Sequence, residues 1–352
     1  MKVQFINANQ AAGMIQDGSN VGLIGGGSGL VEATLLHEYI EKRFLDTGTP
    51  KELTCIHALG IGDREDRGMN RFAHKGMVRR VIGGHWVWSP KMQQLARENS
   101  IEAYVLPGGV IMQLMREVAA KRPGLITHVG LGTFVDPLQD GGRMNEAAVD
   151  PLVERITIDG KDYLRYLPIP IDVALLKGSY ADEEGNISLD EEPANLDIYA
   201  MAAAAHNSGG KVIFQVRKKV AAGSIPARSV RIPSAIVDAV VVDPEQRQSY
   251  EIIYDPSISG ERRNETLQPD FPEFSLRLVI ARRAYQELKE GSVINYGFGI
   301  PDQVASIVAA EERQDSFYQT IEHGTYGGSL LSGNLFGRSE ERRVGKECRS
   351  RW

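Results

Sequence analysis

Short apolar runs rich in β-branched residues recur along the first part of the chain, and most end in glycine turns. Examples are VGLIGGGSGL at 21–30, VIGGHWVW at 81–88, AYVLPGGVI at 103–111 and THVGLGTFVDP at 127–137. Each predicts a short buried strand running into a turn. Helical spacing lies between them, as at 30–48, where Leu36, His37 and Ile40 share one face. The alternation predicts an α/β fold with an open, mostly parallel sheet, which binds ligands at the carboxyl ends of its strands.

Two stretches interrupt this alternation. ITIDGKDYLRY at 156–166 alternates apolar and polar residues around an Asp-Gly turn, which predicts a β-hairpin inserted in the sheet domain. The stretch at 252–274 is polar, rich in Pro, Gly and Ser, and without periodicity, as is typical of a linker. We therefore predict a first domain over 1–251, a linker over 252–274 and a second domain from 275.

After the predicted linker the chain repeats an earlier pattern of helix, acid-Gly-Ser step, strand, glycine loop and helix. The two acid-Gly-Ser steps begin at Asp17 and Glu290. We interpret this as duplication of a whole domain. The alternative is that helix-turn-strand patterns are simply common in α/β proteins. With duplication, the second domain over 275–337 is incomplete, because two strands do not close the core of such a sheet.

Composition and charge restrict the class of protein. The 352 residues are 42% hydrophobic and 24% charged, which is typical of globular proteins, and the length predicts more than one core. A net charge of −6 argues against a general nucleic-acid or anionic-membrane binder. The first twenty residues lack the apolar core of a secretory signal, and no apolar run is long enough for a membrane span. Cys55 has no internal disulfide partner outside the terminal segment, which favours the cytoplasm.

The last fifteen residues differ from the rest. RSEERRVGKECRSRW at 338–352 has a net charge of +3 in a chain whose total is −6. This segment resembles the translation, in one reading frame, of a widely used short-read sequencing adapter. We therefore expect 338–352 to be a non-native tail and Gly337 to be the last residue of the protein. The alternative is a basic arm that binds a partner.

The sharpest candidate for chemistry is FYQTIEHGTYGG at 317–328. Residues 317–321 predict a strand with Glu322 at its carboxyl end, beside Gly324, Gly327 and Gly328. Glycines let backbone amides and a bulky ligand approach closely. A carboxylate nucleophile needs such positioning and stabilisation of the oxyanion formed on attack. The alternative is an acid in a surface turn.

A second glycine loop precedes it, in INYGFGIPDQVASIVAAEE at 294–312. The strand ends at Tyr296, and Pro301 takes the place of the first helical residue. The free N–H groups and positive dipole at such a helix N-terminus suit a phosphate, a carboxylate or an oxyanion. A dinucleotide-binding GxGxxG would need its third glycine at Asp302, so a nicotinamide fingerprint is absent.

Three further stretches have open interpretations. Residues 125–146 form either a wall of a small-molecule pocket or an ordered loop in which Asp136 and Asn145 brace turns. The candidate residues of such a pocket are Gly26, Gly27, Gly130, Gly132 and Thr133. The basic run at 217–233 would meet nucleotide phosphates or form a solvated face. We predict no metal site, because the four histidines considered lack ligand spacing: His57, His74, His85 and His128.

Four motifs in this order, VGLGTFVDPLQDGGRMN, EIIYDPSISGE, GSVINYGFGIPDQVA and TIEHGTYGG, resemble the family I coenzyme A transferases. The resemblance covers residues 1–337 and is greatest to fused-chain acetate/propionate CoA-transferases. It implies a duplicated α/β architecture and a catalytic glutamate at Glu322, although His323 departs from the commonest motif. It also implies an oxyanion and CoA site lined by Gly297, Phe298, Gly299, Ile300, Gly324, Gly327 and Gly328. It makes the five candidate pocket residues named above candidates for an acyl pocket.

By this resemblance Glu322 attacks an acyl-CoA to give a mixed anhydride, and the CoA thiolate then forms a glutamyl-CoA thioester. A short-chain carboxylate, of the acetate or propionate type, takes the CoA by the reverse steps. The resemblance implies CoA thioesters as substrates, no metal or organic cofactor, and a homo-oligomer. We expect the 352-residue chain alone to be inactive. The alternatives are an acyl-CoA hydrolase and a non-catalytic ligand-binding module.

Overall fold

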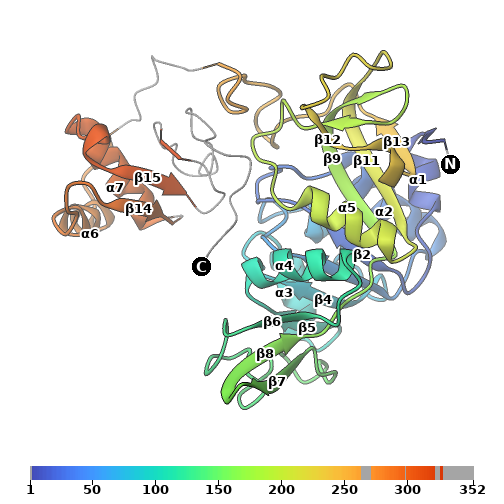
Figure 1. Ribbon diagram of the computed structural model, residues 1–352, viewed down its shortest axis with the longest axis horizontal. Helices are drawn as coiled ribbons and strands as arrows, with labels where there is room; N and C mark the ends of the chain where they lie inside the picture. The colour runs from blue at the N-terminus through green and yellow to red at the C-terminus, as the bar shows by residue number, and fades with distance from the viewer. Residues whose placement is uncertain (1, 263–270, 298, 322–325, 328–352) are drawn as a thin grey trace. The chain divides into compact units, whose positions relative to one another are not determined.

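The first part of the chain folds around one large sheet. A computed structural model describes residues 2–262, 271–297, 299–321, 326 and 327. The sheet has ten strands, and its main path is β1-β13-β11-β9-β2-β3-β4-β5. All pairings along this path are parallel (Figure 1). In path order the bounds are Gln4–Phe5, Ala239–Val242, Lys211–Val220, Val173–Asp182, Asn20–Leu23, Leu53–His57, Val78–Gly83 and Glu102–Val105. Two short strands, β10 (Ile187–Ser188) and β12 (Val230–Ile232), extend β9 in antiparallel pairing.

Helices connect these strands, which confirms the predicted α/β fold. They are α1 (Ala8–Gly13), α2 (Thr34–Thr47), α3 (Pro90–Arg97), α4 (Gly108–Ala119) and α5 (Ile198–Asn207), with 3-10 turns η1 (Met69–Phe72) and η2 (Ser234–Ile236). The predicted face of Leu36, His37 and Ile40 is buried on α2. The helix begins at Thr34 instead of Leu30, because Val31 has a φ of 58° that no right-handed helix accepts.

Helices cover both faces of the sheet, as parallel sheets require. Val21 and Leu23 of β2 belong to one hydrophobic core together with buried residues of α1, α2 and α3. Gly22 between them faces the other side, where α5 packs. A Cβ on Gly22 would lie 2.3 Å from the sulfur of Met201, so the strand has no room for a side chain there. Helices α4 and α5 pack against each other on this side (Figure 1).

The predicted hairpin is present, in a separate antiparallel sheet of order β6-β8-β7. Its strands are β6 (Leu125–Thr127), β7 (Val153–Ile158) and β8 (Lys161–Tyr166). Asp159 and Gly160 form the turn with φ of 50° and 73°, as in a tight two-residue hairpin. Of the stretch 127–137, predicted as a short strand running into a turn, only Thr127 belongs to a strand. Gly130 and Gly132 have φ of 98° and 72°, so the chain turns there instead of extending.

The chain divides into two compact units. The first comprises Met1–Asp190 with Leu196–Ile253, and the second comprises Glu191–Asn195 with the chain from Tyr254. The predicted domain border at 251 lies two residues before this division, whereas nothing in the sequence predicted that Glu191–Asn195 joins the second unit. The predicted tail at 338–352 lies outside the described residues.

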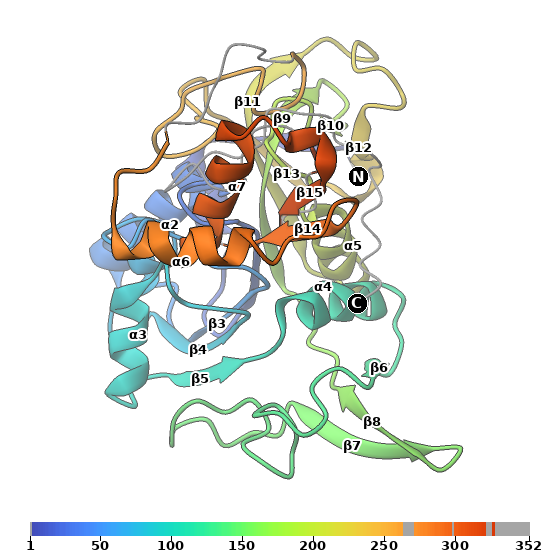
Figure 2. The same ribbon diagram turned by 90° about the vertical axis from the view of Figure 1, so that its left-hand side faces the viewer.

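The second unit repeats the element order that opens the first. It contains α6 (Leu276–Tyr285), β14 (Val293–Tyr296), α7 (Ile300–Ala310), the 3-10 turn η3 (Gln314–Ser316) and β15 (Tyr318–Ile321). The two strands pair in parallel, and α6 and α7 pack together beside them (Figure 2). Helix, strand, glycine loop and helix thus follow one another as α1, β2 and α2 do. No helix in the described parts of the chain has the length and apolar character to traverse a bilayer.

Candidate functional site

Three loops leave the carboxyl ends of neighbouring strands β2, β3 and β4, at 24–33, 58–68 and 84–89. The buried Trp88 of the third loop packs against the other two. A Cβ on Gly27 would lie 2.4 Å from the indole Nε1, and one on Gly60 would lie 2.5 Å from indole Cδ1. Glycine at both positions therefore lets one tryptophan lie against two loops at the edge where open parallel sheets bind ligands.

The loop after β2, residues 24–33, has an unusual backbone. Ser28 and Val31 have φ of 53° and 58°. A β-branched residue at positive φ is a conformational outlier, and such outliers gather at functional sites. One hydrogen bond within the loop and one to the loop after β3 hold it: Gly26 N donates to Leu30 O at 2.9 Å, and Ser28 N donates to Gly62 O at 2.8 Å.

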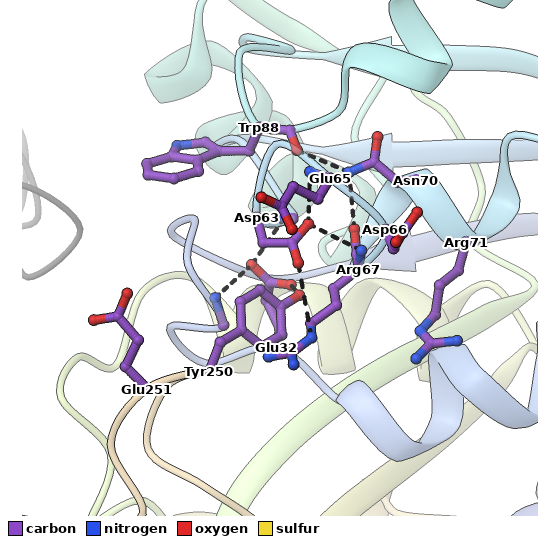
Figure 3. Close-up of polar contacts among 12 residues, drawn as sticks. Glu32, Asp63, Glu65, Asp66, Arg67, Asn70, Arg71, Trp88, Tyr250 and Glu251 are labelled. Carbon is purple, nitrogen blue, oxygen red and sulfur yellow. Dashed lines mark hydrogen bonds and ion pairs between the residues drawn. The ribbon is translucent and has the colours of Figure 1, made fainter.

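A buried carboxylate, Glu32, completes this arrangement. Its Oε1 accepts hydrogen bonds from Gly29 N at 3.2 Å and Gly62 N at 3.1 Å. Its Oε2 accepts a hydrogen bond from the Tyr250 hydroxyl (Figure 3). Desolvation raises the pKa of Glu32 to about 7, against the lowering effect of these bonds and of the Lys177 charge. The sequence reasoning missed Glu32 as a functional residue.

The loop after β3 contributes charged side chains near Glu32. The guanidinium of Arg64 lies over the Trp88 ring at 4.5 Å, and that of Arg67 lies over the Tyr250 ring at 4.9 Å. Asp63 accepts hydrogen bonds from the backbone of Glu65 and Arg67 at 2.9 and 3.0 Å (Figure 3). Exposed guanidinium groups beside a glycine-rich sheet edge suit an anionic ligand.

Two of the predicted histidines also lie at this edge, and both are neutral near pH 7. Burial lowers the pKa of His57 to about 4, partly opposed by its contact with the Leu59 carbonyl, and burial lowers the pKa of His85. His85 Nε2 accepts a hydrogen bond from Gly60 N at 3.0 Å. These rings therefore stabilise the loops. Among the described residues no three His, Cys, Asp or Glu side chains converge on a possible metal position.

In the second unit, parallel pairing brings the glycine loop and the end of β15 to one edge. Tyr296 of β14 is paired with Ile321 of β15, so the loop from Gly297 and the chain after Ile321 leave the sheet together. Gly299 has a φ of 109° and is the N-cap of α7. The helix starts at Ile300, one residue before the predicted start at Pro301, which fits proline in a first turn. Four predicted site residues lie outside the described residues: Phe298, Glu322, Gly324 and Gly328.

After Ile321 the chain returns beside β15. Thr320 forms an antiparallel bridge with Tyr326, and Gly327 N donates to Gln319 O at 2.9 Å. Of the predicted oxyanion and CoA residues, the structure therefore describes Gly297, Gly299, Ile300 and Gly327. Their roles remain predictions.

The predicted acyl-pocket residues fall into two separate places. Gly26 and Gly27 belong to the loop after β2, whereas Gly130 packs against Val135, Leu164 and Tyr166 near the small sheet. Gly132 N donates to Asp136 at 2.8 Å, and the Thr133 hydroxyl donates to Gly130 O at 2.8 Å. The described contacts do not bring the two sets together, and their common role in an acyl pocket stays a prediction.

Asp136 and Asn145 brace turns, in agreement with one of the two interpretations of 125–146. Asp136 also accepts hydrogen bonds from Leu138 N at 3.0 Å and from Arg155 at 3.1 Å. Asn145 accepts a hydrogen bond from Ala103 N at 3.1 Å and donates to Ala96 O in the last turn of α3 and to Ile101 O just before β5. A surface cavity of about 810 Å³ borders this loop, lined by Phe134, Asp140, Arg143, Met144, Asn145, Glu146, Ala148 and Val149.

Comparison with known proteins identifies the family. Residues 5–243 match the Coenzyme A transferase family. The chain belongs to that family, which confirms the resemblance carried by the four motifs.

Individual members of this family are similar to the chain over nearly its whole length. The chain is 38% identical over 352 residues to the acetate CoA-transferase YdiF of Escherichia coli K12, covering 97% of this chain and 65% of that protein. It is 40% identical over 340 residues to the caffeate CoA-transferase of Acetobacterium woodii, covering 96% and 64%. A crystal structure of E. coli O157:H7 YdiF, a thioester complex with CoA, has a TM-score of 0.88, with 38% identity, 93% coverage of this chain and 63% of that one. The chain thus spans just under two thirds of the length of these relatives.

Proposed function

We propose that the full-length protein containing this sequence is an acyl-CoA:carboxylate CoA-transferase with Glu322 as its nucleophile. The observation that carries the proposal is the parallel register of Tyr296 with Ile321. It brings Ile321, the residue before Glu322, to the same edge of the sheet as the glycine loop and the N-terminus of α7. That combination of a carboxylate and free backbone amides suits attack on a thioester.

The first half of the reaction consists of two successive acyl substitutions. The Glu322 carboxylate attacks the acyl-CoA carbonyl, the C–S bond breaks, and a mixed anhydride and CoA thiolate result. The thiolate attacks the glutamyl carbonyl, which releases the first carboxylate and leaves a glutamyl-CoA thioester. A second carboxylate reverses both steps. Backbone N–H groups at the start of α7, after Gly299, are candidates to stabilise each oxyanion.

We propose short-chain acids of the acetate and propionate type as substrates, supported by the name of the YdiF relative. The caffeate CoA-transferase relative makes an aromatic acid the competing substrate class. No cofactor besides the CoA substrate is required, because the glutamate itself carries CoA. A cytoplasmic homo-oligomer completes the proposal.

The test uses protein expressed from the complete reading frame of the source gene. Incubation with acetyl-CoA should add the mass of one CoA, less water, to the protein, as seen by intact mass spectrometry. Glu322→Gln should abolish that adduct, whereas Glu312→Gln, at an exposed acid after α7, should leave it unchanged. An adduct in the Glu322→Gln protein would exclude Glu322 as the nucleophile.

The same preparation separates the alternatives. A transferase releases one acetate per enzyme when the adduct forms, and it turns over and forms propionyl-CoA only when propionate is added. A hydrolase releases CoA from acetyl-CoA continuously in buffer alone. A ligand-binding module would bind CoA equally well after Glu322→Ala and would form no adduct. Assaying the 352-residue chain beside the full-length protein tests our expectation that the shorter chain is inactive.

A further inference from the structure

The segment 246–250, which follows the last strand of the large sheet, lies back over the carboxyl ends of its central strands. Lys177 of β9, which is 1% exposed, donates from Nζ to the carbonyl oxygens of Arg247 at 2.6 Å and Gln248 at 3.3 Å. The Gln246 amide donates to Gly178 O at 2.7 Å. Buried polar side chains therefore tie this segment to β9.

The same segment contacts the loop after β2 through its backbone. Tyr250 N donates to Ser28 O at 3.0 Å. A Cβ on Gly29 would lie 2.5 Å from that nitrogen, so glycine is required for the approach. The positive φ of Gly29, 81°, requires it as well.

Glu32 connects the loop after β2, the loop after β3 and the segment 246–250. One carboxylate accepts from Gly29 of the loop after β2, from Gly62 of the loop after β3 and from the Tyr250 hydroxyl (Figure 3). Its side chain is completely buried. Burial of a carboxylate is unfavourable by several kcal/mol unless its partners compensate, so an acid here implies a use for its bonding pattern.

The second unit repeats this acid. Glu32 follows Gly29 by three residues, and Asp302 follows Gly299 by three residues. Asp302 is also buried, at 6% exposure, in the first turn of α7. Both copies of the repeat thus place a buried carboxylate three residues after the last glycine of the loop. This recurrence is independent of the contacts around Glu32.

We propose that Glu32 is a positioning residue for CoA transfer: with Tyr250 it holds the glycine loop of the first unit in its strained conformation and couples that loop to the chain leading to the nucleophile. Residue 250 lies four positions before Tyr254, where the second unit resumes. This inference rests on the proposed function.

The coupling depends on the charge of Glu32. An ionised carboxylate accepts all three hydrogen bonds, whereas the protonated acid carries its own donor and competes with Tyr250. The charged and titratable groups that act on this pair are Lys177 from β9, Asp63 and Arg67 from the loop after β3, and Tyr250 itself. Because burial raises the pKa of Glu32 to about 7, kcat/KM should fall as the pH drops below that value.

The experiment compares Tyr250→Phe, Glu32→Gln and Glu32→Ala in the full-length protein with the control Glu38→Gln, an exposed acid of α2. Loss of positioning should lower kcat/KM for acetyl-CoA by roughly ten- to a hundredfold in Tyr250→Phe and Glu32→Ala. Combining the two changes should lower it no further, because they remove one interaction. Glu32→Gln should keep more activity than Glu32→Ala, and its rate should no longer fall as the pH drops below 7.

A second readout does not require activity. Amide hydrogen exchange of the peptides covering 24–31 and 246–253 should increase together in Tyr250→Phe, which removes a single oxygen atom and leaves the packing in place. If folded Tyr250→Phe and Glu32→Gln retain the wild-type kcat/KM, pH profile and exchange, the inference is wrong. A lower melting temperature with unchanged kcat/KM and unchanged pH profile also refutes it. If the wild-type protein itself transfers no CoA, the proposed function fails instead, and the exchange result still tests the coupling.

Discussion

The two units use the same succession of helix, strand, glycine loop and buried acid, but their strands have different surroundings. In β2 the last three of the four residues Asn20–Leu23 are buried, and the strand has paired strands on both sides. In β14 only Tyr296, the last of the four residues Val293–Tyr296, is buried, and the described part of its sheet has two strands. A shared motif therefore does not give shared burial. Neighbouring strands determine how much stability each repeat obtains from the same residues.

The largest expected difference is between the effects of removing Glu322 and of removing Glu32 on the rate of CoA transfer. Glu322→Ala in the second unit should lower the transfer rate by roughly 10⁴-fold or more, because it removes the nucleophile. Glu32→Ala in the first unit should lower it by about a hundredfold at most, because it disturbs only positioning. Steady-state rates of propionyl-CoA formation measure both. Equal losses in the two variants would contradict the assignment of roles.

Next in size is the effect of adding a methyl group to glycine. A Cβ on Gly84 would lie 1.9 Å from the Ala58 carbonyl oxygen, so Gly84→Ala must displace backbone and should destabilise the first unit by about 3 kcal/mol. Gly297 of the second unit has no described atom within 4 Å of such a Cβ and no positive φ. Gly297→Ala should change stability by less than about 1 kcal/mol. Hydrogen exchange of peptides from each unit measures both changes, and a stable Gly84→Ala would show that the loops of the first unit are not tightly packed.

Acid should weaken the first unit through a histidine of α2. His37 is fully buried, and desolvation, together with the Arg71 charge, lowers its pKa to about 3. The unfolded chain binds a proton near pH 6.5 and the folded unit does not, so stability falls as the pH drops between these values. From pH 7.5 to 5 this loss amounts to about 2 kcal/mol.

His37→Leu should remove that loss. The test is urea unfolding at the two pH values, followed by the fluorescence of Trp86 and Trp88. The other titrating groups of the first unit, including Glu32, contribute equally to both proteins. If the difference in unfolding free energy between wild type and His37→Leu is the same at both pH values, His37 is accessible to protons in the folded state.

The smallest effect concerns one valine from each of the two strands, buried Val21 of β2 and exposed Val293 of β14. Val21→Thr should destabilise the first unit by about 1 to 2 kcal/mol, since the hydroxyl replaces a methyl group in a dry core. Val293→Thr should change the second unit by less than about 0.5 kcal/mol, because this side chain is exposed. Hydrogen exchange of β2 and β14 peptides compares them. Similar losses would mean that β14 is covered in solution.

Periodicity and glycine turns predicted most of the fold, because buried parallel strands have distinctive compositions. The hairpin at 156–166, the buried face of α2 and the strand before Glu322 all followed from local pattern. The start of α2 did not, because Val31 adopts a positive φ that its side chain disfavours and only tertiary contacts impose. The strand expected at the start of 127–137 ends at Thr127, earlier than its apolar residues suggest, because Asp136 and neighbouring backbone groups close turns there.

The candidate site was only partly predictable. Glu32 occupies a helical pattern in the sequence, and its partner Tyr250 lies 218 residues away. No local signal indicates that pair, although aligning Glu32 with Asp302 in the repeat would have marked both acids. Glu322 was predicted because a strand end and three glycines surround it in sequence; it lies outside the described residues, and its role stays a prediction.

The missing side chain at Gly22 has a consequence for oxidative damage. The sulfur of Met201 fills the space over that glycine, and Met201 is 1% exposed. A sulfoxide oxygen has no room between α5 and β2, so peroxide should reach this methionine only when the helix lifts from the sheet. The rate at which Met201 oxidises should therefore report how often the first unit opens. An oxidised molecule cannot repack α5 against Gly22 as before, so each oxidation also destabilises the closed state.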